Sequence, residues 1–395
     1  MSLLAAPAAV AGGSAEAFSR TLERLVSSGG IAGAQVLIGQ RNRILIERNL
    51  GRVSPAEPRS VDGEAMFCIG STSKPLVSTI VLGLVSEGVL ELDTPIDSVL
   101  PEFGNLTLAA TGRPVRAPTL RELLMHRGGI YSQTRKLTPE QLRLIRDFHL
   151  TLEESVSGIA RQPLIAVPGE RYAYSGAGYC VIGRVAEVAT GKTFEQLLRE
   201  RLARPLEMKR TTYFPSPSDA NVATGSALGS GGKRADPATP HRLGSALKLT
   251  LIGGSIYSTA RDLARFSRMI INHGRLGNVE VLPEPMWRQM TSRQQPGHRL
   301  PNGMVSDYAL GWTRLCAAGD KRPTWLTHGG ALAASRSRLL VNLKNGCYAV
   351  VLYSLGGNSA AARRQTDQAV ARAITGLRDA VQTLKPHVPE AAGRR

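Results

Sequence analysis

The sequence lacks the features that mark several common classes of protein. Its four cysteines lie far apart and form no C-x-x-C pair, which argues against a zinc ribbon or a thiol redox motif. No apolar run approaches the roughly 18 residues that a membrane-spanning helix requires. There are no internal repeats and no low-complexity linkers. With 395 residues, of which 42% are hydrophobic, the chain has the composition of a globular protein that is large enough to be stable without disulfides.

Aromatic residues are also scarce, at 5%, although the net charge is +18. The excess lies in residues 201–395, which carry 28 basic and 11 acidic side chains. The longest basic runs are pairs, whereas nucleic-acid binding calls for clustered Lys and Arg with interleaved aromatics. We interpret the charge as an Arg-rich, solvated surface and expect no specific nucleic-acid partner. Attraction to an anionic polymer would carry no sequence specificity.

The N-terminus does not have the pattern of a secretory signal. Residues 1–11 are small and apolar, but no Lys or Arg precedes them, and an amphipathic helix pattern begins at about Ser14. We therefore favour a cytoplasmic location over export to the periplasm. Residues 1–13 and 381–395 are interpreted as tails around a single domain at 14–380.

The predicted elements indicate a sheet assembled from both ends of the chain. Two β-rich runs, 34–39 and 44–50, predict an N-terminal hairpin. Near the C-terminus, 308–315, 337–343 and 348–353 predict strands, and the Asn-Gly dipeptide between the last two indicates a hairpin.

Helical patterns lie between these strands and after them. They cover residues 120–125, 139–148, 152–160, 178–189, 194–202, 260–271 and 360–377. The sequence thus predicts an α/β (α+β) fold with a central antiparallel sheet flanked by helices. A mostly helical subdomain is inserted at about 100–210.

The most informative segment is an S-x-x-K tetrad, Ser71 to Lys74, at the start of a long apolar helix pattern. Positions i and i+3 share one helix face, so the Lys74 amine can reach the Ser71 hydroxyl. Serine is a weak nucleophile until a neighbouring base takes its proton, and burial lowers the pKa of a lysine enough for that task. The tetrad alone is also compatible with a helix-capping serine and a surface lysine.

Further motifs follow in the same order as in a known family. The sequence resembles the serine β-lactamase/penicillin-binding protein family, in particular its class C-like serine hydrolases, over roughly residues 15–375. The matching segments are FCIGSTSKPLVST at 67–79, LVSEGVLELDTPI at 84–96, PTLRELLMH at 118–126, PGERYAYSG at 168–176, GGSIYST at 253–259, YALGW at 308–312 and HGGA at 328–331. That family also contains D,D-carboxypeptidases, D-aminopeptidases and carboxylesterases. The resemblance implies a β-lactamase-like fold and an acyl-enzyme reaction.

The resemblance also implies individual roles. Ser71 corresponds to the acylated nucleophile and Lys74 to its proton-relay partner. Tyr174 falls on the tyrosine of the family's Y-x-N motif, where a tyrosinate, or a tyrosine sharing a proton with Lys74, would act as the base. The backbone N–H groups of Ser71 and Ala331 would form the oxyanion hole.

Two positions depart from the family pattern. Gly176 replaces the asparagine of Y-x-N, and loss of that amide contact to substrate would cost about 1–3 kcal/mol. This departure favours the esterase-like branch. His328, Gly329 and Gly330 replace the K-T-G element on a predicted strand, where small residues let a substrate lie against the strand edge. We expect His328 to keep a donor near the substrate carboxylate or oxyanion, with full positive charge only below its pKa.

The remaining candidates are interpreted as structural. His126 occupies the L-L-x-H segment, where the family residue has a structural place, and Cys68 is expected to be a buried packing residue. Tyr172 and Tyr179 lack the motif spacing and are assigned to the core. The sequence contains no H-E-x-x-H motif, so we expect no metal and no cofactor. It also has no G-x-S-x-G elbow, which argues against an α/β-hydrolase.

The sequence therefore predicts a serine hydrolase that forms an acyl-enzyme on Ser71 and acts on a small ester or amide. Water, or another alcohol or amine, would release the acyl group. The alternatives are a β-lactamase or D-Ala-D-Ala carboxypeptidase/aminopeptidase, and a non-catalytic binding protein on a degenerate hydrolase scaffold. Substrate specificity is expected to lie in loops such as 225–242 and 291–306. The sequence indicates no particular oligomeric state.

Overall fold

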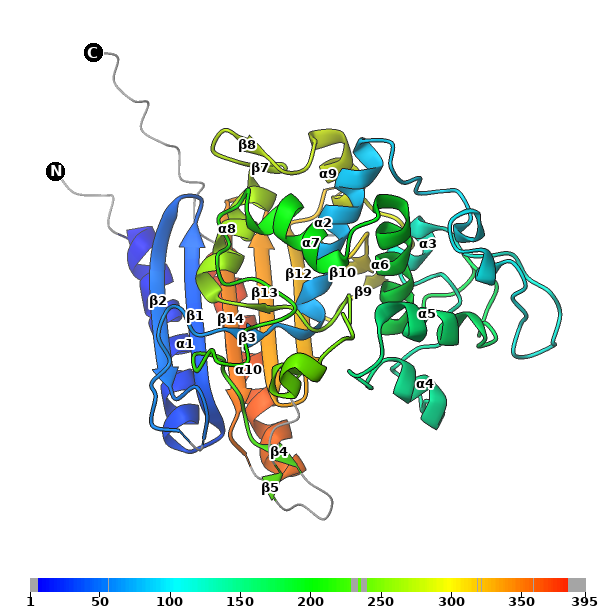
Figure 1. The fold of residues 1–395 in the computed structure, drawn as a ribbon. Coiled ribbons are helices and arrows are strands. Elements are labelled where there is room, and N and C mark those ends of the chain that lie inside the picture. The colour runs from blue at the N-terminus through cyan, green and yellow to red at the C-terminus, as the bar shows by residue number, and fades with distance from the viewer. Residues whose placement is uncertain are drawn as a thin grey trace.

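The computed structural model describes residues 6–55, 57–228, 234–235, 240–317, 319–320, 322–357 and 359–382. Its main feature is an eight-stranded antiparallel sheet with the order β2-β1-β14-β13-β12-β11-β10-β9 (Figure 1). The N-terminal strands β1 and β2 lie beside the C-terminal strands, as predicted. The strands of this sheet are β1 (Ile31–Gln40), β2 (Arg43–Gly51), β9 (His298–Arg299), β10 (Val305–Tyr308), β11 (Thr313–Cys316), β12 (Trp325–Leu332), β13 (Ser335–Asn342) and β14 (Cys347–Leu355).

Short strand pairs and helices complete the fold. The short strands are β3 (Phe67–Cys68), β4 (Ala227–Leu228), β5 (Arg234–Ala235), β6 (Tyr257–Ser258), β7 (Arg275–Leu276) and β8 (Val279–Glu280). The helices are α1 (Ala6–Ser27), α2 (Ser73–Ser86), α3 (Leu120–Leu124), α4 (Pro139–Leu144), α5 (Leu152–Ala160), α6 (Gly176–Thr190), α7 (Phe194–Leu198), α8 (Ala260–Ile271), α9 (Glu284–Thr291) and α10 (Ala360–Gln382). No helix in the described ranges is long and apolar enough to cross a membrane.

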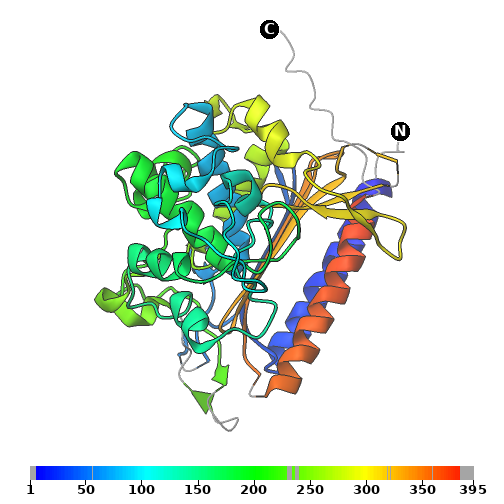
Figure 2. The same ribbon diagram turned by 90° about the vertical axis from the view of Figure 1, so that its right-hand side faces the viewer.

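The sheet separates two helical layers. One face, here called the α10 face, is covered by α1 and α10, which lie side by side (Figure 2). Phe18 and Leu22 of α1 and Val370 and Leu377 of α10 are buried against it. On the other face, here called the α2 face, α8 packs directly on the central strands, and α2 to α7 lie beyond. The larger core cluster lies on this second face.

Both predicted hairpins are present, and α5 and α8 have the predicted bounds. The prediction of one strand at 308–315 was wrong, because the chain turns between β10 and β11. Gly311 in this turn has φ +85°, and its missing side chain leaves room for Ser78 of α2. Trp312 stacks on Phe266 beneath the turn, with 6.1 Å between ring centroids.

Several helix boundaries also differ from the prediction. The helix predicted at 139–148 ends at Leu144, whereas α10 extends beyond 377 to Gln382. The first helix begins at Ala6 rather than at about Ser14. Residues 1–5 and 383–395, in the predicted tails, lie outside the described ranges.

Candidate active site

Ser71 lies in a 3-10 turn, Gly70–Thr72, that leads directly into α2. Gly70 has φ +53°, a left-handed conformation that favours glycine. A Cβ atom on Gly70 would lie 2.5 Å from the backbone nitrogen of Ala331 in β12. A Cβ atom on Gly330 would overlap the carbonyl oxygen of Ile69. The two glycines therefore let the backbone of β12 pack directly against the turn that carries Ser71.

The amine of Lys74 points back toward Ser71 from the first turn of α2. Its Nζ lies 3.1 Å from Oγ of Ser71 and donates a second hydrogen bond, of 2.8 Å, to the carbonyl oxygen of Gly253. Lys74 is only 1% exposed, and burial lowers the pKa of its amine to about 7. This geometry rules out the interpretation of a capping serine with a surface lysine. A substantial fraction of the Lys74 side chains is neutral at neutral pH.

Tyr174 lies two residues before α6, and its ring lies beside Ser71 and Lys74. Nζ of Lys74 is 4.8 Å from the centroid of the Tyr174 ring, and the Ser71 hydroxyl is near enough to the phenol to affect its pKa. Burial raises the pKa of Tyr174 to about 12, although the nearby Ser71 hydroxyl acts in the opposite direction. The phenol therefore keeps its proton at neutral pH, and the neutral Lys74 amine is the stronger candidate for the base.

His126 holds Tyr174 in place. Its Nδ1 accepts a 3.1 Å hydrogen bond from the backbone N–H of Ser175, and its carbonyl oxygen accepts one of 2.8 Å from Ala173. The His126 and Tyr174 rings are in contact, with centroids 4.2 Å apart. Burial holds the pKa of His126 well below its usual value, so this contact involves a neutral ring. These contacts are structural, as predicted.

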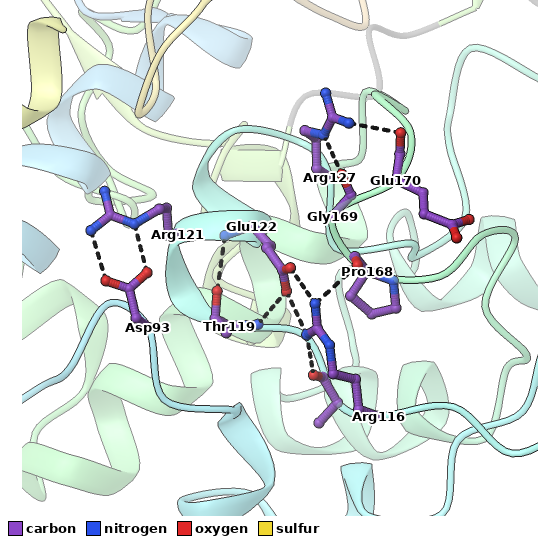
Figure 3. A network of polar contacts seen from close by, with 10 residues as sticks. Asp93, Arg116, Thr119, Arg121, Glu122, Arg127, Pro168, Gly169 and Glu170 are labelled. Carbon is purple, nitrogen blue, oxygen red and sulfur yellow. Dashed lines mark hydrogen bonds and ion pairs between the residues drawn. The ribbon is translucent and has the colours of Figure 1, made fainter. Parts of the chain in front are cut away.

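A surface network ties the segment around His126 to the segment before Tyr174 (Figure 3). Arg116 pairs with Glu122 of α3 and donates a 3.0 Å hydrogen bond to the carbonyl oxygen of Pro168. Arg127 donates a 2.8 Å hydrogen bond to the carbonyl oxygen of Gly169. The motifs at 118–126 and 168–176, which lie about 50 residues apart in sequence, are thereby fixed to one another. This contact helps to position Tyr174 beside Ser71.

His328 does not offer the donor that the sequence analysis expected. Its Nδ1 lies 2.9 Å from the carbonyl oxygen of Gly329, which can only accept, so Nδ1 carries the proton. Nε2 then accepts a hydrogen bond of 2.9 Å from the hydroxyl of Tyr308. Burial, together with the positive charge of Lys74, lowers the pKa of His328 to about 3. Both ring nitrogens are engaged within the protein, and the ring is neutral.

Gln133 occupies the space that a side chain at position 176 would need. Its Oε1 accepts a 2.9 Å hydrogen bond from the backbone N–H of Gly176, and a Cβ atom on Gly176 would overlap this oxygen. Gln133 also lines the groove that contains Ser71 and Tyr174. A side-chain amide is therefore present beside Ser71, but it comes from a different segment than the Y-x-N motif.

The groove in front of Ser71 has a volume of about 540 Å³ and follows β12. The ladder between β11 and β12 covers only Trp325 to Thr327 on the β12 side. From His328 onward, this edge of β12 is therefore not paired with β11. Gly329, Gly330 and Ala331 line the groove, as the sequence analysis expected for a substrate lying against the strand edge.

Comparison with known proteins identifies the family. The beta-lactamase family model matches residues 18–373. The chain belongs to the beta-lactamase family. Penicillin-binding protein 4 of Amycolatopsis lactamdurans is 29% identical over 220 residues, which cover 54% of this chain and 53% of the relative. Esterase EstB of Burkholderia gladioli is 32% identical over 187 residues, or 45% and 46% of the two chains. The matched region thus spans about half the length of each relative.

A solved structure confirms the β-lactamase-like fold. EstCE1, described as a hydrolase with promiscuous acyltransferase activity, superimposes with a TM-score of 0.74 at 22% identity. The match covers 94% of this chain and all of EstCE1. The predicted family and the predicted fold class are therefore confirmed.

The structure brings together most of the residues that family resemblance had singled out. Other predictions had mixed outcomes: Cys68 and Tyr179 are buried, but Tyr172 is 43% exposed and is not a core residue. Tyr308 and Gln133 were not predicted as partners of the site. Tyr308 opens a recognised motif, whereas nothing in the sequence around Gln133 marks it.

The described residues contain no group of three or more His, Cys, Asp or Glu side chains that could hold a metal ion. Of the loops expected to determine specificity, 225–242 falls partly outside the described ranges.

Proposed function

We propose that this beta-lactamase family member is a serine hydrolase that forms an acyl-enzyme on Ser71 and cleaves small carboxylic esters. The observation that carries the proposal is the buried Lys74 amine 3.1 Å from Oγ of Ser71, with a pKa lowered to about 7. A neutral amine at this distance can accept the serine proton during attack.

In the first step, Oγ of Ser71 bonds to the carbonyl carbon while its proton moves to Nζ of Lys74. The carbonyl π electrons move to oxygen, and the backbone N–H groups of Ser71 and Ala331 stabilise the resulting oxyanion. The close packing of Ala331 against Gly70 supports this pairing of donors. Because both donors belong to the backbone, they need not reorganise as charge develops.

In the second step, the bond between the carbonyl carbon and the leaving alkoxide breaks. The alkoxide takes the phenolic proton of Tyr174, and the Lys74 ammonium returns a proton to the phenol. Water then attacks the acyl-enzyme, loses its proton to the same pair, and the acid leaves as Oγ of Ser71 is reprotonated. The raised pKa of Tyr174 supports a role as proton donor, because the phenol is protonated when the step begins.

One observation supports amides as a second class of substrate. Gly176 leaves the Y-x-N motif without its side-chain amide. Gln133 places another side-chain amide beside Ser71. Oε1 of Gln133 is engaged by Gly176, which leaves its NH₂ group available to a substrate carbonyl. The D-Ala-D-Ala carboxypeptidase and β-lactamase alternatives therefore stay open to test.

The test compares hydrolysis of p-nitrophenyl butyrate and nitrocefin by the intact protein and by Ser71→Ala. Ser86→Ala is the matched control, since Ser86 is exposed at the far end of the same helix. Ester turnover that disappears only in Ser71→Ala would support the proposal. Faster Ser71-dependent turnover of nitrocefin would instead support the β-lactamase alternative. Intact mass after treatment with a fluorophosphonate should show one adduct, on Ser71. No adduct and no turnover would favour the non-catalytic scaffold.

A further inference from the structure

The site has a second and much smaller compartment beside Ser71, here called the inner chamber. Its volume is about 20 Å³, whereas the groove has about 540 Å³. Ser71, Gln133 and Ala331 line both compartments, so the proposed oxyanion position lies where the two meet. The inner chamber is further bounded by Lys74, Arg146, Leu251, Gly253, Gly254 and Leu332.

The position of Tyr174 indicates which part of an ester each compartment receives. Tyr174 lines the groove but is not among the residues that line the inner chamber. In the proposed mechanism its phenol protonates the leaving alkoxide, so the alcohol part of the ester lies in the groove. The carbonyl oxygen faces the backbone donors of Ser71 and Ala331. The third substituent of the carbonyl carbon, the acyl chain, therefore points into the inner chamber.

Much of the wall of the inner chamber belongs to the packed interior. Leu251 and Leu332 are buried members of the larger core cluster. A Cβ atom on Gly253 would lie 2.9 Å from Cβ of Tyr179 and 3.1 Å from Nζ of Lys74, so the backbone is already in close contact there. These parts of the wall cannot move away from a longer acyl chain without disturbing the core or the catalytic amine.

Arg146 forms a different part of the wall. It lies two residues after α4, and its side chain both lines the inner chamber and is exposed to solvent. Its Nη1 donates a 2.9 Å hydrogen bond to the carbonyl oxygen of the preceding residue, Ile145. Within the described part of the chain, no carboxylate lies within ion-pair distance of Arg146. The arginine thus separates the chamber from solvent without a charged partner to hold it.

We propose that Arg146 closes the inner chamber and thereby limits the acyl group of the substrate to a short chain, of about four carbons or fewer. This inference rests on the proposed hydrolase function and names the substrate class: short-chain acyl esters of bulky alcohols. A longer chain would press on the buried leucines or displace the guanidinium, and overfilling a packed site is unfavourable. The alcohol is not limited in this way, because the groove is open along β12.

The principal experiment compares p-nitrophenyl butyrate with p-nitrophenyl octanoate. The two esters share a leaving group, so the ratio of their kcat/KM values, butyrate over octanoate, reports how well the acyl chain fits. We expect a ratio of about 100 or more for the intact protein. Arg146→Ala should lower the ratio about tenfold or more, mainly through faster cleavage of octanoate, because the chain can then extend through the opening into solvent.

The matched control is Arg143→Ala. Arg143 is an exposed arginine of α4 that pairs with Glu140 and does not line the inner chamber. Its removal changes the net charge by the same amount and should leave the ratio unchanged. A decrease equal to that of Arg146→Ala would overturn the proposal.

A second variant separates closure of the chamber from the effect of charge. Arg146→Met removes the charge but keeps a long side chain, so the ratio should stay close to that of the intact protein. Equal decreases in Arg146→Met and Arg146→Ala would overturn the closure. A merely structural role of Arg146 would lower kcat/KM for both esters and leave the ratio unchanged.

A change of alcohol tests the assignment of the two compartments. The butyrate esters of p-nitrophenol and of the larger 4-methylumbelliferone should be cleaved at similar rates, because both alcohols lie in the groove. Discrimination against the larger alcohol, together with equal cleavage of butyrate and octanoate, would place the acyl chain in the groove and overturn the proposal.

Failure of this proposal can be distinguished from failure of the proposed function. Ser71-dependent cleavage of octanoate that is as fast as that of butyrate would overturn the closed chamber alone. If no ester is cleaved, the binding of alkylboronic acids decides the matter. Boron bonds to Oγ of Ser71, the serine proton passes to Nζ of Lys74, and the alkyl group takes the place of the acyl chain.

The measurement is the rise in Tm of the intact protein with each acid. Propylboronic acid should raise Tm more than heptylboronic acid, and Arg146→Ala should remove this difference. Equal stabilisation by the two acids would overturn the closed chamber, and no stabilisation by either would overturn it together with the proposed function.

Discussion

Oε1 of Gln133 accepts the backbone N–H of Gly176 across 2.9 Å, at the position where a side chain on residue 176 would begin. Two segments more than 40 residues apart in sequence thus both contribute to the same part of the site. One provides the backbone that starts α6, and the other provides the amide beside Ser71. Residue 176 must be glycine for Gln133 to occupy this place, and the same glycine replaces the asparagine of the family's Y-x-N motif.

Restoring the family asparagine should therefore reduce activity. Gly176→Asn forces the Gln133 side chain out of its place, and we expect kcat/KM for p-nitrophenyl butyrate to fall about tenfold, which corresponds to about 1.4 kcal/mol. Gly176→Asn combined with Gln133→Ala relieves the overlap and should recover part of the loss. Steady-state kinetics on the four proteins of this cycle measure the coupling.

The matched control is Gly191→Asn at the other end of α6. Gly191 has φ +68°, which asparagine tolerates, and a Cβ atom there would meet no other atom within 4 Å. The activity of Gly191→Asn should stay close to that of the unmodified protein. Strict additivity of the Gly176 and Gln133 substitutions would contradict the shared-space explanation.

The pH dependence of catalysis should follow Lys74. Its pKa is lowered to about 7, and only the neutral amine can accept the Ser71 proton. We expect kcat/KM to rise through pH 7 and to fall about tenfold for each pH unit below it. Lys74→Arg, whose guanidinium stays protonated, should be inactive across the range. A flat profile between pH 5 and 9 would exclude Lys74 as the base.

The hydroxyl of Tyr174 should matter more than its ring. Tyr174→Phe keeps the packing against His126 but removes the proton donor, so kcat should fall roughly 10²- to 10⁴-fold. Tyr172→Phe, at the neighbouring and 43% exposed ring, is the control and should be close to the unmodified enzyme. The phenol would be excluded from proton transfer if both variants lost activity to the same small extent.

Acid should destabilise the protein through His328. The unfolded chain binds a proton at the ordinary histidine pKa of about 6.5, whereas the folded protein does so only near 3. The free energy of unfolding should therefore decrease as pH falls from about 6.5 toward 3, by at most about 1.4 kcal/mol per pH unit from this group. The measurement is urea unfolding at pH 7 and pH 5.

Substitution of the histidine should reduce that loss. His328→Gln should show a smaller decrease between the two pH values, while His298→Gln, at an exposed site, should behave like the unmodified protein. Equal decreases in all three proteins would show that other groups, such as the buried His126, account for the acid sensitivity.

The parts of the fold that could be predicted from sequence are those with strong local determinants. Helix α8 begins after Thr259, whose hydroxyl accepts the N–H of Asp262, and its apolar residues recur at helical spacing. The turn before β14 carries Asn-Gly, with Gly346 at φ +73°. The failure at 308–315 was also local in origin, because Gly311 interrupts a run that otherwise has the composition of a strand.

The candidate site was predictable where family motifs supply residues and not where tertiary contacts do. Ser71, Lys74 and Tyr174 belong to recognisable segments. The hydrogen bond that engages Nε2 of His328 comes from Tyr308, which is 20 residues away and reaches it only because β10 folds back on β11. Likewise, Gln133 acquires its position from packing against Gly176, and no local pattern in the sequence predicts that contact.

The assembly of the sheet from both ends of the chain has a consequence for biosynthesis. Ser71, Lys74 and Tyr174 all lie within the first 174 residues, whereas Ala331, the proposed second oxyanion donor, lies in β12. Strand β12 is in turn held by β13 and β14, which end at Leu355. A nascent chain can therefore complete the proposed oxyanion site only after β12, β13 and β14 have been translated and have paired. Such non-local closure also makes folding slow. A product that ends before β12 would carry Ser71, Lys74 and Tyr174 but would lack the proposed oxyanion donor of Ala331.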